Sequence, residues 1–463
     1  MGCDPPRVGV IIPMHQARAT IERALESLRR QSPADWAAIV IDDGSSDAGP
    51  ELVRRVAAGD PRIRLIRQGN RGLAGARNRG LDEIRAQFVL FLDADDWILP
   101  GSLDALIRAA SATGAVCGRH AFFDEVGSPL GLESSPPWPE MGLEHLLRSN
   151  RIAPHAHLVR RDLIGDLRFD ARFPGVEDWD LWVRLAEHGV RWRSVDRTVA
   201  AYRLRDQSMS KDAERMFASA RGVVESACRR AIARGEAPET SRGRRDRAIA
   251  SQSLFYATVA AVRAQDDVAR RILGDRNARG VDAGDGAEAG DAAYWAVVYG
   301  RGAKPTPTSA RDWFPRVCDL WMDLPGADRD AWLDAARSRL AMLMVDPGDV
   351  ACALLDRADA HGPITLIGLG HNGRLLARAA LERGLPLLVR DDRPCDGDPL
   401  LDDPGVRLEP MNSPLTSDRG AIITPGDDEA LAARFPGALR WTHVHAQMAR
   451  RVLKVLSPVR TAA

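Results

Sequence analysis

The first 92 residues alternate short apolar runs with segments of helical periodicity, and this alternation most restricts the folds open to the chain. Short apolar runs are typical of buried strands, whereas apolar residues such as Ile21, Leu25 and Leu28 repeat with helical spacing. The predicted strands and helices, in chain order, are Val8–Ile12, Ala17–Arg30, Ala38–Ile41, Glu51–Ala58, Ile63–Ile66, Ala74–Arg85 and Phe88–Leu92. Strands separated by helices of this length predict a parallel sheet covered on both faces.

The pattern changes after about residue 210, where strand-forming residues become rare. We expect long helices over Lys211–Gly235, Arg244–Leu273 and Asp312–Val345, and a loop over Gly274–Asp291, which is rich in glycine, aspartate and alanine. From about residue 362 a strand–loop–helix–strand pattern begins. The sequence therefore predicts an α/β domain over 1–210, a helical region over 211–361 and a small α/β domain over 362–463.

The last of these domains contains a glycine-rich turn, GLGHNG at 368–373, between the apolar run Ile364–Ile367 and a predicted helix. Asp391 and Asp392 follow the next predicted strand. This context is typical of a Rossmann-like, dinucleotide-binding unit. A vestigial unit, or one that serves only for interaction, is the alternative we favour, because about 100 residues are few for a complete NAD domain.

Charge and cysteine usage exclude several classes of protein. The 64 basic and 64 acidic residues cancel, so we expect no nucleic-acid partner. Six scattered cysteines form no CxxC pair, which indicates a reducing, cytoplasmic location. No signal peptide or apolar run of membrane-spanning length is expected. The basic segment Gln447–Leu456 favours a docked terminal helix, with peripheral contact at the inner face of the membrane as the alternative.

Three acidic motifs follow apolar runs or precede helices: DDGS at 42–45, DADD at 93–96 and EDWD at 177–180. Clustered carboxylates repel one another unless a cation or hydrogen bonds compensate them. Mg²⁺ or Mn²⁺, completed by substrate phosphates, is the natural occupant of such a cluster. The alternative for each motif alone is a helix cap.

Five elements occur in order: IIPMHQ, IVIDDGSSD, GNRGLAGARNRGLD, FVLFLDADDWILP and EDWDLWVRLAEHG. Together they resemble the family 2 glycosyltransferases, which are inverting, nucleotide-sugar-dependent enzymes with the GT-A fold. The resemblance covers roughly residues 7–210. It implies a GT-A nucleotide-diphospho-sugar transferase domain, followed here by the helical region and the Rossmann-like unit.

The resemblance assigns the DADD motif to the donor diphosphate. It implies that Asp95 ligates Mn²⁺ or Mg²⁺, which neutralises the departing diphosphate. It implies that Asp93 contacts the ribose or assists the metal. Asp96 is expected either to contact the donor sugar or to cap the following helix.

The resemblance also implies a nucleotide site around the first two loops. Asp43 is expected to hydrogen-bond the base, with Asp42 bracing the turn. Pro13 and His15 stand where the family usually has a Pro-x-Tyr-Asn pattern, and the imidazole would stack on the base. Arg77 is expected to reach the nucleotide or diphosphate.

On the acceptor side, the family places a general base in the ED pair, and we expect Asp178 to serve, with Glu177 as the alternative. Arg205 stands where many relatives have a histidine. It cannot ligate a metal, but it can pair with phosphate oxygens. His155 and His157 stand where relatives line the acceptor pocket, although a structural role is the more common one for such histidines.

The predicted function is transfer of a sugar, with inversion, from a nucleotide-diphospho-sugar to a hydroxyl of a glycan or lipid-linked acceptor. The resemblance favours UDP as the nucleotide. It also favours a role in the synthesis of bacterial surface polysaccharide or lipopolysaccharide. Two alternatives stay open: a bifunctional protein whose last unit binds NAD, and a non-catalytic nucleotide-sugar-binding scaffold. The absence of any tyrosine after Tyr299 weighs against a Tyr-x-x-x-Lys proton relay in that unit.

Overall fold

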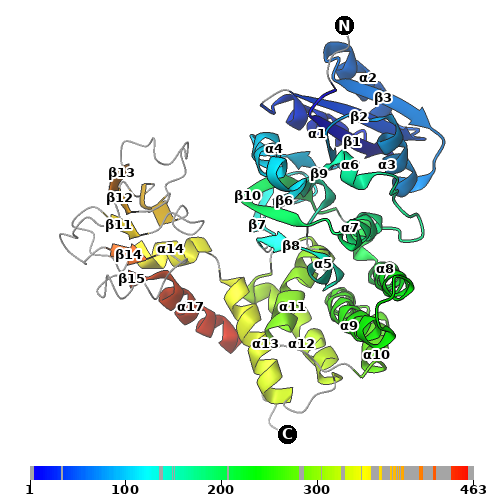
Figure 1. The fold of residues 1–463 in the computed structure, drawn as a ribbon. Helices are drawn as coiled ribbons and strands as arrows, with labels where there is room; N and C mark the ends of the chain where they lie inside the picture. Colours follow the sequence, from blue (N-terminus) through cyan, green and yellow to red (C-terminus); the bar gives the residue numbers. More distant parts are fainter. Residues whose placement is uncertain are drawn as a thin grey trace. The chain divides into compact units, whose positions relative to one another are not determined.

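The computed structural model of the chain is described for most residues up to 355 and for shorter segments beyond (Figure 1). The described residues are 5–32, 35–134, 139–148, 150, 152–205, 208–280, 286–303, 305–324, 329–345, 347–355, 364–367, 376–377, 379–381, 383, 385, 387–390, 406–409, 421–423 and 439–456. They form two compact units. The first comprises Met1–Asp282, Trp295–Lys304 and Asp323–Pro325, and the second comprises the rest.

The N-terminal part of the first unit contains the predicted alternation of strands and helices. The strands are β1 (Val8–Met14), β2 (Trp36–Asp43), β3 (Ile63–Gln68) and β4 (Phe88–Phe91), and the helices are α1 (Ile21–Arg29), α2 (Gly49–Gly59) and α3 (Gly72–Glu83). The strands pair in parallel in the order β3-β2-β1-β4. Right-handed crossovers then place α1 and α2 on one face of the sheet and α3 on the other.

Strand β1 is the central strand of this parallel part and is buried along its whole length. Its neighbours β2 and β4 are also almost entirely buried, which explains their continuous apolar runs. Helix α3 packs directly against β1 and β2. Because the carboxyl ends of β1, β2 and β4 meet at one sheet edge, the loops that follow them lie together.

Beyond the parallel part, which was predicted, the sheet continues as a mixed sheet. The added strands are β5 (Trp97–Ile98), β6 (Ala115–Phe123), β7 (Pro129–Glu133), β8 (Glu140–Met141), β9 (His157–Arg160) and β10 (Trp192–Arg203). The order continues β4-β9-β6-β10-β5, with β9 antiparallel to both β4 and β6. Together these strands make the mixed α/β, GT-A-like domain that the resemblance implies.

Helices follow the sheet, as predicted, although with different boundaries. They are α8 (Ala213–Ala233), α9 (Pro238–Val262), α10 (Asp266–Asn277) and α11 (Gly286–Arg301). The expected single helix over Arg244–Leu273 is wrong, because the chain reverses at Ala264, whose φ is +60°, so that α10 packs back on α9. The expected loop over Gly274–Asp291 is also too long, since α10 and α11 occupy both of its ends.

The second unit contains helices and a small parallel sheet. The helices are α12 (Pro307–Met322), α13 (Arg329–Met344), α14 (Pro347–Leu355) and α17 (Trp441–Leu456). The strands β11 (Ile364–Ile367), β12 (Leu387–Arg390), β13 (Val406–Glu409), β14 (Ala421–Ile423) and β15 (Leu439–Arg440) pair in the order β13-β12-β11-β14-β15. The GLGHNG turn, Asp391 and Asp392 lie outside the described residues, so the Rossmann-like, ligand-binding interpretation stays a prediction.

Helix α17 contains the basic segment for which the sequence left two interpretations. It packs against α12, α13 and α14, and the His445 Nε2 donates a hydrogen bond to the carbonyl oxygen of Met342 at 3.0 Å. These contacts support the docked terminal helix. Among the described residues, every helix is too short or too polar to cross a bilayer.

Candidate functional site

The nucleotide side of the site is built around Asp43, at the carboxyl end of β2. Its Oδ1 accepts hydrogen bonds from the Gln68 Nε2 and from the backbone N–H of Arg71, both at 2.8 Å. The Nδ1 of His15 donates to the carbonyl oxygen of Asp43 at 3.0 Å. Because the His15 ring is exposed while Pro13 is buried, the loop after β1 presents an imidazole at this edge.

Asp42 braces the turn, as expected. Its side chain is fully buried, its Oδ2 accepts a 2.6 Å bond from the Arg67 Nε, and its Oδ1 accepts from the N–H of Ser45 at 3.0 Å. These bonds fix the turn that Gly44 makes with a φ of +82°, a conformation that favours glycine. Asp42 therefore holds the loop that presents Asp43.

The DADD loop follows β4, and its three carboxylates have different surroundings. Asp96 points inward, where its Oδ1 accepts a 2.6 Å hydrogen bond from the N–H of Arg203. Its Oδ2 lies 3.4 Å from the Nδ1 of His155, in the 3₁₀ turn Pro154–Ala156. Burial, together with the charges of Asp95 and Asp93, raises the pKa of Asp96 well above its usual range.

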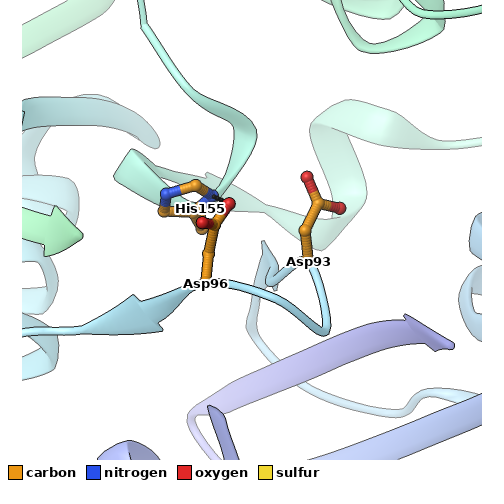
Figure 2. Close-up of side chains that lie close together, drawn as sticks. All are labelled: Asp93, Asp96 and His155. Atoms are coloured by element: carbon orange, nitrogen blue, oxygen red, sulfur yellow. Dashed lines mark ion pairs between the residues drawn. The ribbon is translucent and has the colours of Figure 1, made fainter. Parts of the chain in front are cut away.

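Asp93, Asp96 and His155 form a candidate metal cluster, with one potential ligand atom from each lying within 4.8 Å of the others (Figure 2). Burial lowers the pKa of His155 to about 4, so the ring is neutral at physiological pH. A neutral imidazole and carboxylate oxygens are suitable donors for a divalent transition-metal ion such as Mn²⁺. The residues present therefore fit the predicted metal.

Asp95, the predicted metal ligand, is paired with a cation. Its Oδ2 lies 3.2 Å from the Arg205 Nη1, and both side chains are partly exposed. The predicted diphosphate-binding arginine thus lies beside the predicted metal ligand, two residues after the end of β10. A phosphate group could replace the carboxylate on this guanidinium, because each offers anionic acceptor oxygens that an arginine fork can pair with.

Arg77 lies between the two halves of the site. Its Nη1 donates to the Glu177 Oε1 at 2.7 Å and its Nη2 to the Asp93 Oδ1 at 2.6 Å. The side chain is only 2% exposed. Burial alone would lower the pKa of Arg77, but the charges of Asp93 and Glu177 raise this pKa above its usual value. The guanidinium therefore stays charged. Arg77 thus ties α3 to the DADD loop and to α7 (Glu177–Glu187).

The two members of the ED pair differ in how their oxygens are used. Both oxygens of Glu177 are engaged, Oε1 by Arg77 and Oε2 by the N–H of Gly175 at 2.7 Å. In Asp178, Oδ1 accepts from the N–H of Trp179 at 2.7 Å and from the Asn150 Nδ2 at 3.4 Å. Burial raises the pKa of Asp178 to about 7, and the Glu177 charge adds to the increase while Arg77 opposes it.

Three residues near the site, His155, His157 and Asn150, had other expected roles or none. His157 stacks on Trp182 with ring centroids 4.8 Å apart, so it belongs to the core. His155 lies against Asp96, as described above. Asn150, which the sequence reasoning did not single out, contacts Asp178 from 28 positions away in the chain. An isolated asparagine in a polar loop carries no local signal of such a role.

Comparisons with known proteins find relatives of the N-terminal part of the chain. The family model described as Glycosyl transferase family 2 matches residues 9–167. The chain is 30% identical over 148 residues to the putative glycosyltransferase EpsH of Bacillus subtilis, which covers 32% of this chain and 43% of that protein. It is 30% identical over 188 residues to the GalNAc(5)-diNAcBac-PP-undecaprenol beta-1,3-glucosyltransferase of Campylobacter jejuni, covering 39% and 60% respectively.

The match to these relatives is thus limited to about half of their length. Among solved structures, the Staphylococcus aureus TarS fragment 1-349 in complex with UDP-GlcNAc aligns with a TM-score of 0.41 and 17% identity. That alignment covers 60% of this chain and 93% of the TarS chain. The family model matches the segment that carries the DDGS and DADD motifs, so the similarity to glycosyl transferase family 2 is a property of the N-terminal domain, over residues 9–167.

Proposed function

We propose that the protein transfers a sugar from a nucleotide-diphospho-sugar, with UDP as the favoured nucleotide, to a hydroxyl of a glycan or lipid-linked acceptor. The observation that carries this proposal is the convergence of Asp43, the DADD loop and Asp178 at one edge of a family 2 domain. The undecaprenol-linked substrate in the name of the Campylobacter relative favours a lipid-linked acceptor and a role in surface glycan synthesis. A cytoplasmic location, at the inner face of the membrane, is part of the proposal.

On the donor side, each loop has a separate task. Asp43 and His15 receive the nucleoside, with the free face of the imidazole stacking on the base. Asp93 is held in place by Arg77, so its second oxygen is oriented toward the ribose or the metal. Arg205 leaves Asp95 and pairs with a phosphate oxygen when the donor binds.

A divalent ion would be held by the DADD carboxylates, with His155 as a further candidate ligand. Such an ion would neutralise the negative charge that develops on the departing diphosphate. Asp95 would also be available to such an ion if Arg205 turned to the phosphate. Because Arg205 already brings one positive charge to this place, we propose that donor binding depends less on metal than a site without the arginine would.

The transfer step needs one base and no covalent intermediate. The acceptor oxygen attacks the anomeric carbon on the side opposite the diphosphate, and its proton passes to Asp178. The bond between the anomeric carbon and the phosphate oxygen breaks, and its electron pair leaves with the nucleoside diphosphate. A single displacement of this kind inverts the configuration. Glu177 is less suited to act as the base, because its two oxygens already accept hydrogen bonds.

Calorimetric titration of UDP, GDP and dTDP, each with and without Mn²⁺, tests the donor site. We expect one nucleotide to bind the wild-type protein, and Asp95→Ala to lose the part of the affinity that depends on Mn²⁺. Arg205→Ala is the matched variant, and it should lose affinity even without metal. If none of the nucleotides binds to the wild-type protein, the transferase proposal is wrong. A non-catalytic scaffold that binds another ligand would then be the better explanation.

A further inference from the structure

A surface groove lies at the amino ends of β1 and β4, on the sheet edge opposite the loops of the candidate site. This amino-edge groove has a volume of about 620 Å³, a size typical of small-ligand sites. Pro5, before β1, and Ala86, before β4, line it together with Leu81 and Ile84 around the end of α3. Strand β1 has seven residues and spans about 20 Å, so the two sheet edges are well separated.

The amino-edge groove carries an excess of positive charge. Arg85, Arg161 and Arg168 line it, with Asp82 as the one acidic residue among its lining side chains. The Arg168 Nη2 lies 2.8 Å from the Asp82 Oδ1. Arg85 and Arg161 form no ion pair with any residue that the structure describes. Two of the three guanidiniums are therefore not compensated by a carboxylate in the groove.

Backbone carbonyl groups hold these two guanidiniums in place. The Arg161 Nη2 donates to the carbonyl oxygen of Leu81 at 3.3 Å, and its Nη1 donates to that of Gly165 at 3.1 Å. The Arg85 Nη1 donates to the carbonyl oxygen of Asp82 at 2.9 Å. Because a guanidinium has five N–H donors, each side chain keeps donors for a further acceptor.

The positive charges of the amino-edge groove also oppose one another. Burial lowers the pKa of Arg161, and the charges of Arg168 and Arg85 lower it further, against the opposite effect of Asp82 and Asp166. An anion between the guanidiniums would remove this repulsion, whereas a neutral ligand would not. Capping of α3 accounts for the bonds to its last carbonyl groups, but not for an open groove that all three arginines line.

We propose that the amino-edge groove is a second ligand site, which binds a phosphate monoester carrying an apolar organic group. An arginine fork pairs with phosphate oxygens through parallel N–H···O bonds. A phosphate monoester has a charge of about −1.5 to −2 near pH 7, which complements the two uncompensated guanidiniums. The organic group would lie against Pro5 and Ala86, next to the buried side chains of Leu81 and Ile84. This inference is independent of the proposed transferase function.

Calorimetric titration of the full chain with phenyl phosphate tests the inference, with inorganic phosphate as the comparison. We expect phenyl phosphate to bind more tightly, because inorganic phosphate has no apolar group. Ala86→Glu keeps all three arginines and adds a negative charge to the groove, so it should abolish binding. Arg85→Gln, which changes an exposed side chain, should weaken binding about tenfold, the size of one charge-assisted hydrogen bond.

Arg205→Gln is the matched control, because it removes an arginine from the opposite edge of the sheet. It should bind phenyl phosphate as tightly as the wild type. Thermal unfolding of each variant shows whether it is folded. Binding that is lost in Arg205→Gln but retained in Ala86→Glu and Arg85→Gln would place the phosphate at the donor loops and overturn the inference.

A soluble metabolite and a lipid headgroup both offer a phosphate monoester, and vesicles distinguish these sources. The protein is sedimented with vesicles of phosphatidylcholine, with and without phosphatidic acid. Retention that requires phosphatidic acid and is lost in Ala86→Glu assigns the groove to a lipid, whereas phenyl phosphate binding without retention assigns it to a soluble ligand. If neither phenyl phosphate nor phosphatidic acid binds to the wild type, the inference is wrong. Failure of UDP, GDP and dTDP to bind would contradict only the transferase proposal.

Discussion

The site contains three carboxyl groups whose surroundings differ, those of Asp178, Glu177 and Asp96. Glu177 is compensated by Arg77 and by a backbone N–H. Asp96 accepts a backbone hydrogen bond beside His155 in the interior. Asp178 has no direct cationic partner among its described contacts, and burial raises its pKa to about 7. A group with a pKa near the working pH combines useful ionisation with adequate basicity, which suits it for proton transfer.

Asp178→Asn is expected to lower the rate of sugar transfer about 10²–10⁴-fold, the usual contribution of a positioned base. Nucleotide affinity should be unchanged in calorimetry, because the base lies on the acceptor side. The variant should also be at least as stable as the wild type at pH 8, since the raised pKa means that ionised Asp178 is unfavourable in the folded state. Glu177→Gln, the matched variant, should lower thermal stability instead. A normal transfer rate in Asp178→Asn would assign the base to another residue.

The pH dependence of transfer follows from the same group. Asp178 must be ionised to accept a proton, and burial raises its pKa to about 7. The rate should therefore fall as pH decreases through about 7, approaching a tenfold loss per pH unit below it. The measurement is kcat/KM against pH with stopped-assay detection of the nucleoside diphosphate. A profile that stays flat down to pH 5 would contradict this assignment.

Arg77 is predicted to be structural as well as functional. Its guanidinium is 2% exposed and bridges two carboxylates, so Arg77→Ala leaves Glu177 buried without its cation. We expect a loss of about 3–5 kcal/mol in the free energy of unfolding, measured by denaturant titration. The control is Arg54→Ala, which breaks an exposed ion pair with Glu51 and should cost less than about 1 kcal/mol. Equal effects of the two substitutions would show that the Arg77 bridge does not stabilise the fold.

At the scale of elements, the close contact between α3 and β1 depends on Gly80, which has no side chain. A Cβ at Gly80 would lie 2.3 Å from the Cγ2 of Ile11, which is fully buried. Gly80→Ala should therefore destabilise the protein by about 1–3 kcal/mol through overpacking, despite the better helix propensity of alanine.

The matched control lies at the end of α2. A Cβ at Gly59 would meet nothing within 4 Å, so Gly59→Ala should be neutral or slightly stabilising. Thermal unfolding of both variants, followed by circular dichroism, gives the comparison. A Gly80→Ala protein as stable as the wild type would mean that α3 can move away from β1 at little cost.

The elements differ in how far the sequence predicts them. Strands β1, β2 and β4 are predictable because continuous apolar runs are required where both sheet faces are covered. Because their carboxyl ends share one edge, the positions of Asp43 and Asp93 follow as well. The break at Ala264 is not predictable, because alanine is a strong helix former and only tertiary packing of α10 on α9 favours its positive φ.

Contacts between distant segments account for most of what the sequence does not predict in the site. The proximity of Arg205 to Asp95 and of Asn150 to Asp178 depends on strands β6, β9 and β10, whose order does not follow the chain. The pairing of Arg77 with Glu177 spans 100 positions. Motifs identify which chemical groups belong to the site, but the tertiary fold decides which of these groups contact one another. The individual roles in the donor site therefore stay predictions.

At the scale of the whole molecule, the first compact unit extends beyond the α/β domain predicted for 1–210 and includes α8 to α10 and the end of α11. Glu187, whose side chain is 1% exposed, lies 2.7 Å from Arg230 of α8. The fully buried ring of Phe122 packs on Trp295 and Tyr299. These contacts indicate that the sheet and the helices following it fold together.

We therefore expect a protein truncated after residue 304 to unfold cooperatively and to bind the same nucleotide as the full chain. A protein truncated after residue 210 should be insoluble or lack a cooperative thermal transition, because Glu187 would stay buried without Arg230 and Phe122 would lose its aromatic partners. Breaking a buried ion pair alone costs about 3–5 kcal/mol, a large part of a typical domain's stability. Differential scanning calorimetry of both proteins provides the measurement. If the shorter protein folds and binds nucleotide normally, the helices are an independent addition and their contacts to the sheet contribute little to the donor site.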